Sequence, residues 1–134
     1  MKALISYSSS DGEDIASKLE IEFKSQNVRY WISKSAISKS EMWLEEIDKA
    51  LTSEIDFVLG VITKDYLTSI GGKEAYAAIS KQFRDGSIHF IPLFFIDPED
   101  CKSAFIQAMD GFVFTENFNE GLLKLLNFLV LLQN

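Results

Sequence analysis

The sequence predicts a single domain of the α/β class, built on a five-stranded parallel sheet with helices on both faces. Along all 134 residues, short apolar runs alternate with longer stretches in which apolar residues recur at helical spacing. This alternation is typical of parallel sheets. The run from Phe57 to Ile62 is apolar throughout, as expected of a central strand buried on both faces. The sequence contains no repeat, linker or low-complexity segment, so residues 1–134 are expected to form one domain.

Each predicted strand is followed by a predicted helix. Strands are expected at residues 3–7, 28–32, 56–63, 88–96 and 112–114. Helices are expected near 15–23 and 43–51 and over 73–84, 98–109 and 118–132. One residue among Ser8, Ser9, Ser10 and Asp11 is expected to cap the first helix. Because Pro92 lacks an N–H group, the fourth strand should lie towards an edge of the sheet or be irregular there.

The common strand order for this pattern is 2-1-3-4-5, in the three-layer arrangement of flavodoxin-like folds. Ligands of such sheets bind beyond the carboxyl ends of the strands, where the order reverses between strands 1 and 3. Two loops lead away from that point, Tyr7 to Asp11 and Lys64 to Glu74. We therefore expect the functional residues to lie in these loops.

Composition excludes several classes of function. The chain carries 20 acidic and 13 basic residues, a formal net charge of -7, which argues against nucleic acid as a partner because a basic face is missing. The lone cysteine, Cys101, fits a reducing, cytoplasmic location. No apolar segment is long enough to suggest a membrane partner. His89 is the only histidine and lacks partners at metal-ligand spacing, so no metal site is expected.

Several segments resemble motifs of the TIR (Toll/interleukin-1 receptor) domain family, in the family's order and spacing. They are Ile5-Ser6-Tyr7-Ser8, the stretch from Trp31 to Trp43, Asp65 to Ser69, and Phe90 to Leu93 with its proline. Family members usually carry Asp, Gly and often Trp at three positions where this chain has Ser33, Ser40 and Ile70. The resemblance covers nearly the whole chain.

This resemblance implies an enzyme of the bacterial NAD-cleaving type, which breaks the nicotinamide–ribose bond of NAD+. Glu74 falls where enzymatic TIR domains carry their catalytic glutamate. NAD+ is then a substrate, and no bound cofactor is implied. The residues expected to contact NAD+ lie in the two loops named above and after the second strand: Tyr7, Ser8, Ser9, Ser33, Ile37, Trp43, Tyr66 and Ser69.

The resemblance also implies protein partners. Many TIR domains bind other TIR domains, and the loop from Ser33 to Glu41 is expected to dock on a neighbouring copy. A fused or separate sensor, and a role in signalling or bacterial antiphage immunity, are further expectations that come from the family.

One carboxylate is enough for the expected reaction, because nicotinamide leaves as a neutral group and needs no general acid. The transition state resembles an oxocarbenium ion, which a nearby negative charge stabilises. From its position alone, Glu74 also fits the first turn of a helix, where the macrodipole favours a carboxylate by about 0.3–1 kcal/mol. A non-enzymatic TIR scaffold is the alternative function. A less favoured alternative is an FMN-binding flavodoxin, since the segment from Met1 to Gly12 resembles its phosphate loop.

Overall fold

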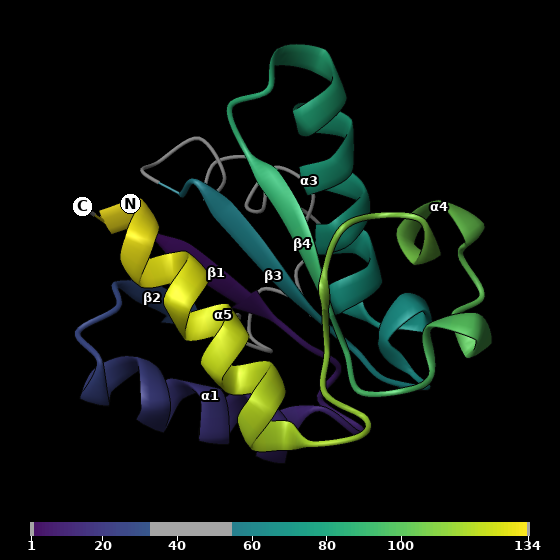
Figure 1. Cartoon of the computed structure of the whole chain (residues 1–134). Coiled ribbons are helices and arrows are strands. Elements are labelled where there is room, and N and C mark those ends of the chain that lie inside the picture. Colours follow the sequence, from purple (N-terminus) through teal and green to yellow (C-terminus); the bar gives the residue numbers. More distant parts are fainter. Residues whose placement is uncertain (1, 33–54, 134) are drawn as a thin grey trace.

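A computed structural model describes residues 2–32 and 55–133, which form a three-layer α/β fold (Figure 1). Its five strands are all parallel and lie in the order β2-β1-β3-β4-β5, which confirms the predicted fold class and strand order. The strands are β1 (Ala3–Ser6), β2 (Tyr30–Ile32), β3 (Phe57–Ile62), β4 (His89–Phe94) and β5 (Phe112–Val113). The helices are α1 (Glu13–Ser25), α3 (Ile70–Asp85), α4 (Ala104–Gln107) and α5 (Phe118–Gln133), with 3-10 turns η2 (Tyr66–Thr68) and η3 (Pro98–Asp100).

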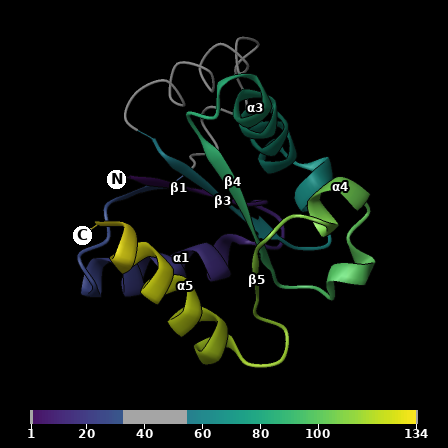
Figure 2. The same cartoon turned by 45° about the horizontal axis from the view of Figure 1, so that its top comes forward.

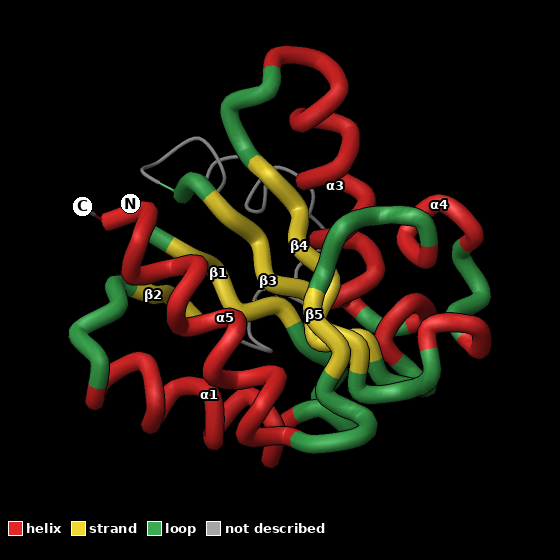
Figure 3. The backbone as a smooth tube through the Cα atoms, in the orientation of Figure 1, coloured by secondary structure: helices red, strands yellow, loops and turns green. Residues whose placement is uncertain are grey.

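The helices cover the sheet from both sides, α1 and α5 on one face and α3 on the other (Figures 2 and 3). Successive residues of a strand point to opposite faces. Ala3 and Ile5 therefore pack with α1 and α5, whereas Leu4 packs in the layer beneath α3. The central strand β3 is buried along nearly its whole length, as its apolar sequence predicts.

The proline of β4 lies where the sheet needs no donor. Although β4 lies between β3 and β5 in the strand order, β5 pairs only with Leu93 and Phe94 within the described residues. On that side of β4, the Phe90 N–H donates to Gln82 Oε1 at 2.9 Å. The backbone nitrogen of Pro92 faces the same side of β4 as that of Phe90, one residue before the pairing with β5 begins. The first part of β4 is therefore an open edge, which is what the proline indicated.

The prediction that a serine or Asp11 caps the first helix is wrong. The N-cap of α1 is Gly12, and no side chain makes a capping hydrogen bond there. The Gly12 N–H donates to the Ser8 carbonyl at 2.7 Å, and a β-carbon on Gly12 would lie 2.9 Å from that oxygen. The tight turn selects glycine at this position, and Asp11 is left to bond to another loop.

Helix α3 begins earlier than predicted, at Ile70 instead of Lys73. The adjacent glycines Gly71 and Gly72 resemble a loop in the sequence. In the structure they lie in the helix, and Ser69 caps it by accepting the Gly71 N–H at 3.0 Å. The helix ends at Asp85, one residue past the predicted end, and its C-cap is Gly86, whose φ of 69° is left-handed.

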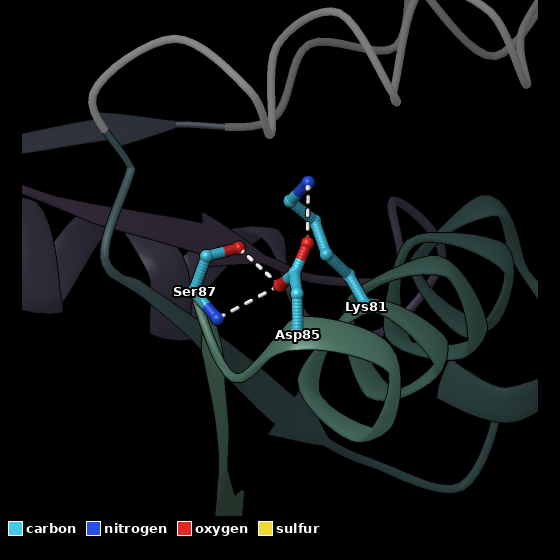
Figure 4. A network of polar contacts seen from close by, with 3 residues as sticks. All are labelled: Lys81, Asp85 and Ser87. Carbon is cyan, nitrogen blue, oxygen red and sulfur yellow. Dashed lines mark hydrogen bonds and ion pairs between the residues drawn. The ribbon is translucent and has the colours of Figure 1, made fainter.

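Asp85 is the last residue of α3. Its Oδ1 accepts hydrogen bonds from the Ser87 O–H at 2.6 Å and from the Ser87 N–H at 2.9 Å (Figure 4). Lys81 forms an ion pair with the other oxygen at 3.6 Å. These contacts lower the pKa of Asp85, mainly through the Ser87 hydroxyl and N–H. The turn that leads into β4 is therefore stabilised by an exposed carboxylate.

The predicted helix over 98–109 is two short pieces. Asp97 caps η3 by accepting the Glu99 N–H at 3.0 Å, and Ser103 caps α4 by accepting the Ile106 N–H at 3.2 Å. The backbone of Cys101, between them, is extended. Two capping residues six positions apart therefore restart the helix. None of the helices in the described part of the chain combines the length and apolar character needed to span a bilayer.

Candidate functional site

The two loops predicted to meet at the carboxyl ends of β1 and β3 are joined by side-chain hydrogen bonds. Asp11 accepts from the Thr63 hydroxyl at 2.6 Å through Oδ1 and from the Asp65 N–H at 3.0 Å through Oδ2. The Ser10 hydroxyl donates to Asp65 Oδ2 at 2.8 Å. Because β1 and β3 are neighbours in the sheet, one carboxylate from the loop after β1 can accept from two groups after β3 and so joins the two loops.

Glu74 is buried beside the end of β1. Its side chain is 2 % exposed, and its Oε1 accepts a hydrogen bond from the Ser6 hydroxyl at 2.8 Å. The first turn of α3 contains no acidic residue, since the helix begins at Ile70 and Glu74 lies in the second turn. The macrodipole interaction falls off within the first turn, so the simpler explanation of this glutamate is wrong. A carboxylate removed from water is costly unless hydrogen bonds or charges compensate, which suggests a function.

Tyr66 lies beneath this carboxylate. Its side chain is fully buried, and its hydroxyl is 2.9 Å from the Ser6 Oγ. Burial raises the pKa of Tyr66 far above its ordinary value, with a smaller contribution from the charge of Glu74. Tyr66 was predicted to contact NAD+, but the structure places it inside the core, where its hydroxyl meets Ser6.

A surface hollow of about 500 Å³, within the range of small-molecule sites, lies at the start of α3 and reaches the residue that precedes Glu74. Three residues predicted to bind NAD+ line it, namely Ser8, Ser9 and Ser69. The Ser8 hydroxyl is buried and lies 3.0 Å from the Ser10 hydroxyl, whereas Ser9 is exposed. Lys73 adds a cationic side chain. Glu74 does not itself line the hollow, although Lys73 precedes it directly on α3.

Tyr7 directly follows Ser6, the last residue of β1, and its side chain is half-buried. Burial raises the pKa of Tyr7 most, and the negative charges of Glu13 and Glu74 raise it further. The phenol therefore stays neutral at physiological pH. Tyr7 senses the charge of Glu74 but does not line the hollow beside it.

The remaining predicted contacts cannot be placed. Ser33, Ile37 and Trp43, and the loop from Ser33 to Glu41, lie outside the described residues. Within the described part of the chain, no group of three histidine, cysteine, aspartate or glutamate side chains is arranged to hold a metal ion.

Sequence reasoning missed Ser6, the residue that touches Glu74. A signal was present in the alternation of the strand. Ser6 shares its face with Leu4 and is completely buried, so a polar side chain points at the helix that carries Glu74. Thr63 is a similar case, since it is buried directly after β3 and bonds to Asp11. Buried hydroxyls that follow an apolar strand mark this site.

A family model described as TIR domain matches residues 4–126. The chain belongs to the TIR domain family. Its fold is similar to the TIR domain of the Toll-related receptor TRR-2 from Hydra magnipapillata, with 15% identity, a TM-score of 0.65, and coverage of 93% of this chain and 97% of that one. It is also similar to the TIR domains of the activated Roq1 resistosome, which directly recognizes the pathogen effector XopQ. That match has 12% identity, a TM-score of 0.67 and 96% coverage of both chains. A search of curated proteins found no match.

Proposed function

We propose that this TIR domain cleaves NAD+ between nicotinamide and ribose, with Glu74 as the key carboxylate. The observation that carries the proposal is the burial of Glu74 at the reversal point of the sheet, where its oxygen is held by Ser6 at 2.8 Å. Open α/β sheets bind ligands at that point. The TIR resemblance assigns the catalytic glutamate to the same residue.

The reaction asks little covalent chemistry of the protein. The bond between the anomeric carbon and the pyridinium nitrogen breaks, and nicotinamide leaves with the electron pair as a neutral molecule. Positive charge develops on the ribose, as in other glycoside cleavages. The Glu74 carboxylate stabilises that charge, and it does so more strongly at a site with little water than in bulk solvent. Water then adds to the anomeric carbon and loses a proton, which gives ADP-ribose, or an acceptor within the molecule gives a cyclic product.

The hollow lined by Ser8, Ser9 and Lys73 provides room and polar groups for the rest of the substrate. Hydroxyls and an ammonium group suit ribose oxygens and phosphates. Because Glu74 is only 2 % exposed, the proposed reaction also requires the wall between the carboxylate and the hollow to open when NAD+ binds. Such local opening on substrate binding is common in enzymes.

The proposed setting is cytoplasmic signalling or antiphage defence. The lone cysteine, Cys101, is not in a disulfide, which suits a reducing compartment. Activation by self-assembly, with a fused or separate sensor as trigger, is part of the proposal. One structural neighbour comes from an activated resistosome, which supports an assembled active state for this family.

The test is chromatography of NAD+ incubated with wild type and with Glu74→Gln, over a range of protein concentrations. We expect nicotinamide release by wild type and a loss of at least about 10²-fold in the variant, the scale for removing one key electrostatic group. Glu99→Gln, at an exposed carboxylate of η3, is the matched control and should keep full activity. Activity per molecule should rise with concentration if assembly completes the site. A Glu74→Gln protein as active as wild type would exclude Glu74 from the mechanism.

Binding to other TIR domains without catalysis is the second candidate function. It is favoured by an exposed aromatic groove of about 750 Å³ between α3 and α4. Tyr76 and Phe83 are 74% and 70% exposed on α3, and the Phe83 ring meets the Phe105 ring edge-on at 5.4 Å. Contiguous exposed apolar surface is typical of interaction sites. If wild type releases no nicotinamide at any concentration, this function is the one that remains.

A further inference from the structure

Glu74 is held by a chain of two hydrogen bonds that joins three separate elements. The Glu74 Oε1 on α3 lies 2.8 Å from the Ser6 Oγ at the end of β1, and that atom lies 2.9 Å from the Tyr66 hydroxyl in η2. All three side chains are buried, with exposures of 2 %, 0% and 0%. Hydrogen bonds out of water are stronger than those in water, and chained bonds reinforce one another.

The direction of proton donation along this chain follows from Tyr66. Burial raises the pKa of Tyr66 far above its ordinary value, so the phenol keeps its proton. Within the described residues the only acceptor recorded for that proton is the Ser6 Oγ. Ser6 then has its own single hydrogen left to donate, and the Glu74 oxygen at 2.8 Å is a much better acceptor than the Gly71 carbonyl at 3.5 Å. Tyr66 therefore donates to Ser6, and Ser6 donates to Glu74.

Glycines on two elements make room for the Tyr66 ring. A β-carbon on Gly71 would lie 2.4 Å from the ring carbon Cε1 of Tyr66. A β-carbon on Gly60, in β3, would lie 3.0 Å from the Tyr66 hydroxyl and 2.4 Å from the Phe90 ring. Two elements thus place glycine where the phenol must fit. The hydroxyl that starts the donor chain is fixed by packing before any substrate binds.

We propose that Ser6 and Tyr66 are positioning residues that fix the orientation of the Glu74 carboxylate and favour its ionised form. Donors directed at a carboxylate favour the charged state, which offsets the cost of its burial. In catalysis the pair acts through Glu74, so this part of the inference rests on the proposed NAD+ cleavage. The effect on ionisation does not depend on that function.

The other titratable groups that face Glu74 must be considered in a test. Within the described residues, the charge of Glu74 is felt by Tyr66 below it and by Tyr7 after β1. Both phenols have raised pKa values, so neither changes charge near neutral pH. Lys73, the preceding residue on α3, lines the neighbouring hollow and is unchanged in all the variants. A change in the acid titration of Glu74 between variants then reports the donor chain.

The experiment measures the titration of the Glu74 carboxyl by carbon NMR in full-length protein labelled with 13C at the glutamate side chains. The Glu74 signal is identified by its loss in Glu74→Gln. The variants are Ser6→Ala, which removes the direct donor, and Tyr66→Phe, which removes the first donor and keeps the ring. Ser87→Ala is the matched control, because Ser87 is an exposed serine in the turn after α3, where its hydroxyl bonds to Asp85. The kcat and KM for NAD+ are measured on the same samples.

We expect Ser6→Ala to move the carboxyl titration to higher pH by about one unit or more, and Tyr66→Phe to move it in the same direction by less. In Ser6→Ala, kcat should fall about 10- to 100-fold while KM changes by less than about threefold, because substrate contacts are retained. The control should match wild type in both measurements. A substitution that only destabilised the fold would lower the amount of active protein without shifting the titration of the Glu74 carboxyl.

Two outcomes separate this inference from the proposed function. If the variants titrate as wild type does and keep its kcat, while Glu74→Gln is inactive, the donor chain is irrelevant and the proposal is overturned. If the titration moves as expected but wild type never consumes NAD+, the positioning role stands and the enzymatic function fails. Should Ser6→Ala not fold, Tyr66→Phe decides the question alone, because the retained ring preserves the packing against Gly60 and Gly71.

Discussion

The two ends of the same sheet are built from opposite chemistry. At the carboxyl ends, Ser6, Thr63 and Glu74 are buried polar residues joined by hydrogen bonds between loops and helices. At the amino ends, the Phe57 ring stacks on His89 at 5.9 Å and meets Phe128 edge-on at 6.0 Å. This aromatic group lines a hollow of about 690 Å³, larger than the one beside Glu74.

The difference separates the size of a hollow from the chemistry of its surroundings. The larger hollow is walled mainly by side chains that cannot ionise or donate protons, and its aromatic contacts contribute to stability. The smaller one reaches the residue before Glu74, a buried carboxylate that accepts a hydrogen bond from Ser6. Substitutions at the amino end should therefore alter mainly stability, and those at the carboxyl end should alter activity.

Phe128→Ala should give the largest loss of stability among the following substitutions. Phe128 packs between Phe57 and Phe112, with ring centroids 6.0 and 5.7 Å away. Truncation removes both ring contacts of a partly buried side chain, and we expect a loss of about 2 kcal/mol in the free energy of unfolding. Urea unfolding measures this, while nicotinamide release per folded molecule should not change. Phe118→Ala, on the same helix at its other end, is the comparison variant. A fall in kcat in Phe128→Ala would show that the two ends are coupled.

Much of the fold could be predicted from the sequence because the patterns that specify it are local. The apolar run of β3 and the alternation of strands with helices predicted the sheet, and Pro92 predicted the open edge beside β4. The misjudged boundaries depended on which of several candidate residues caps a helix. Gly71 lies in α3 because Ser69 accepts its N–H, and the adjacent glycines resemble a loop in the sequence.

The sequence predicted where the site lies but not which contacts form it. The reversal of strand order nominated the loops that hold Ser8 and Glu74. The roles of Asp11 and Ser6 were missed, because Asp11 resembles a helix cap and Ser6 resembles an ordinary strand residue. Each bonds to a partner more than 50 positions away. Such partners become visible only when the register of the parallel strands is known.

Asp11→Ala should give a smaller loss at the carboxyl end. The substitution leaves the Thr63 hydroxyl and the Asp65 N–H without the acceptor that joins the two loops. We expect a loss of about 1–2 kcal/mol in the free energy of unfolding, together with a rise in KM because the hollow loses its spacing. Asp14→Ala, at an exposed carboxylate in the first turn of α1, should lose only about 0.5 kcal/mol. If Asp11→Ala keeps the wild-type KM, the loop connection does not shape the hollow.

The smallest effect is expected at the turn after α3, where Ser87→Ala removes a donor to Asp85. The Ser87 hydroxyl and N–H hold the pKa of Asp85 below its ordinary 3.8, with a lesser contribution from Lys81. A depressed pKa in the folded state stabilises the protein above the unfolded pKa, and that stabilisation is lost as pH falls through the folded pKa.

Ser87→Ala should therefore melt slightly below wild type at pH 7, since the backbone N–H still donates and part of the stabilisation is retained. The difference should shrink as the pH falls below the ordinary pKa of 3.8 and the carboxyl becomes protonated in both proteins. Thermal melts across this range measure it, and nicotinamide release at neutral pH should be unchanged because the turn lies at the amino end of β4. A melting difference that is equal at pH 7 and at acid pH would mean that the charge of Asp85 contributes nothing, and that Ser87 acts through the geometry of the turn alone.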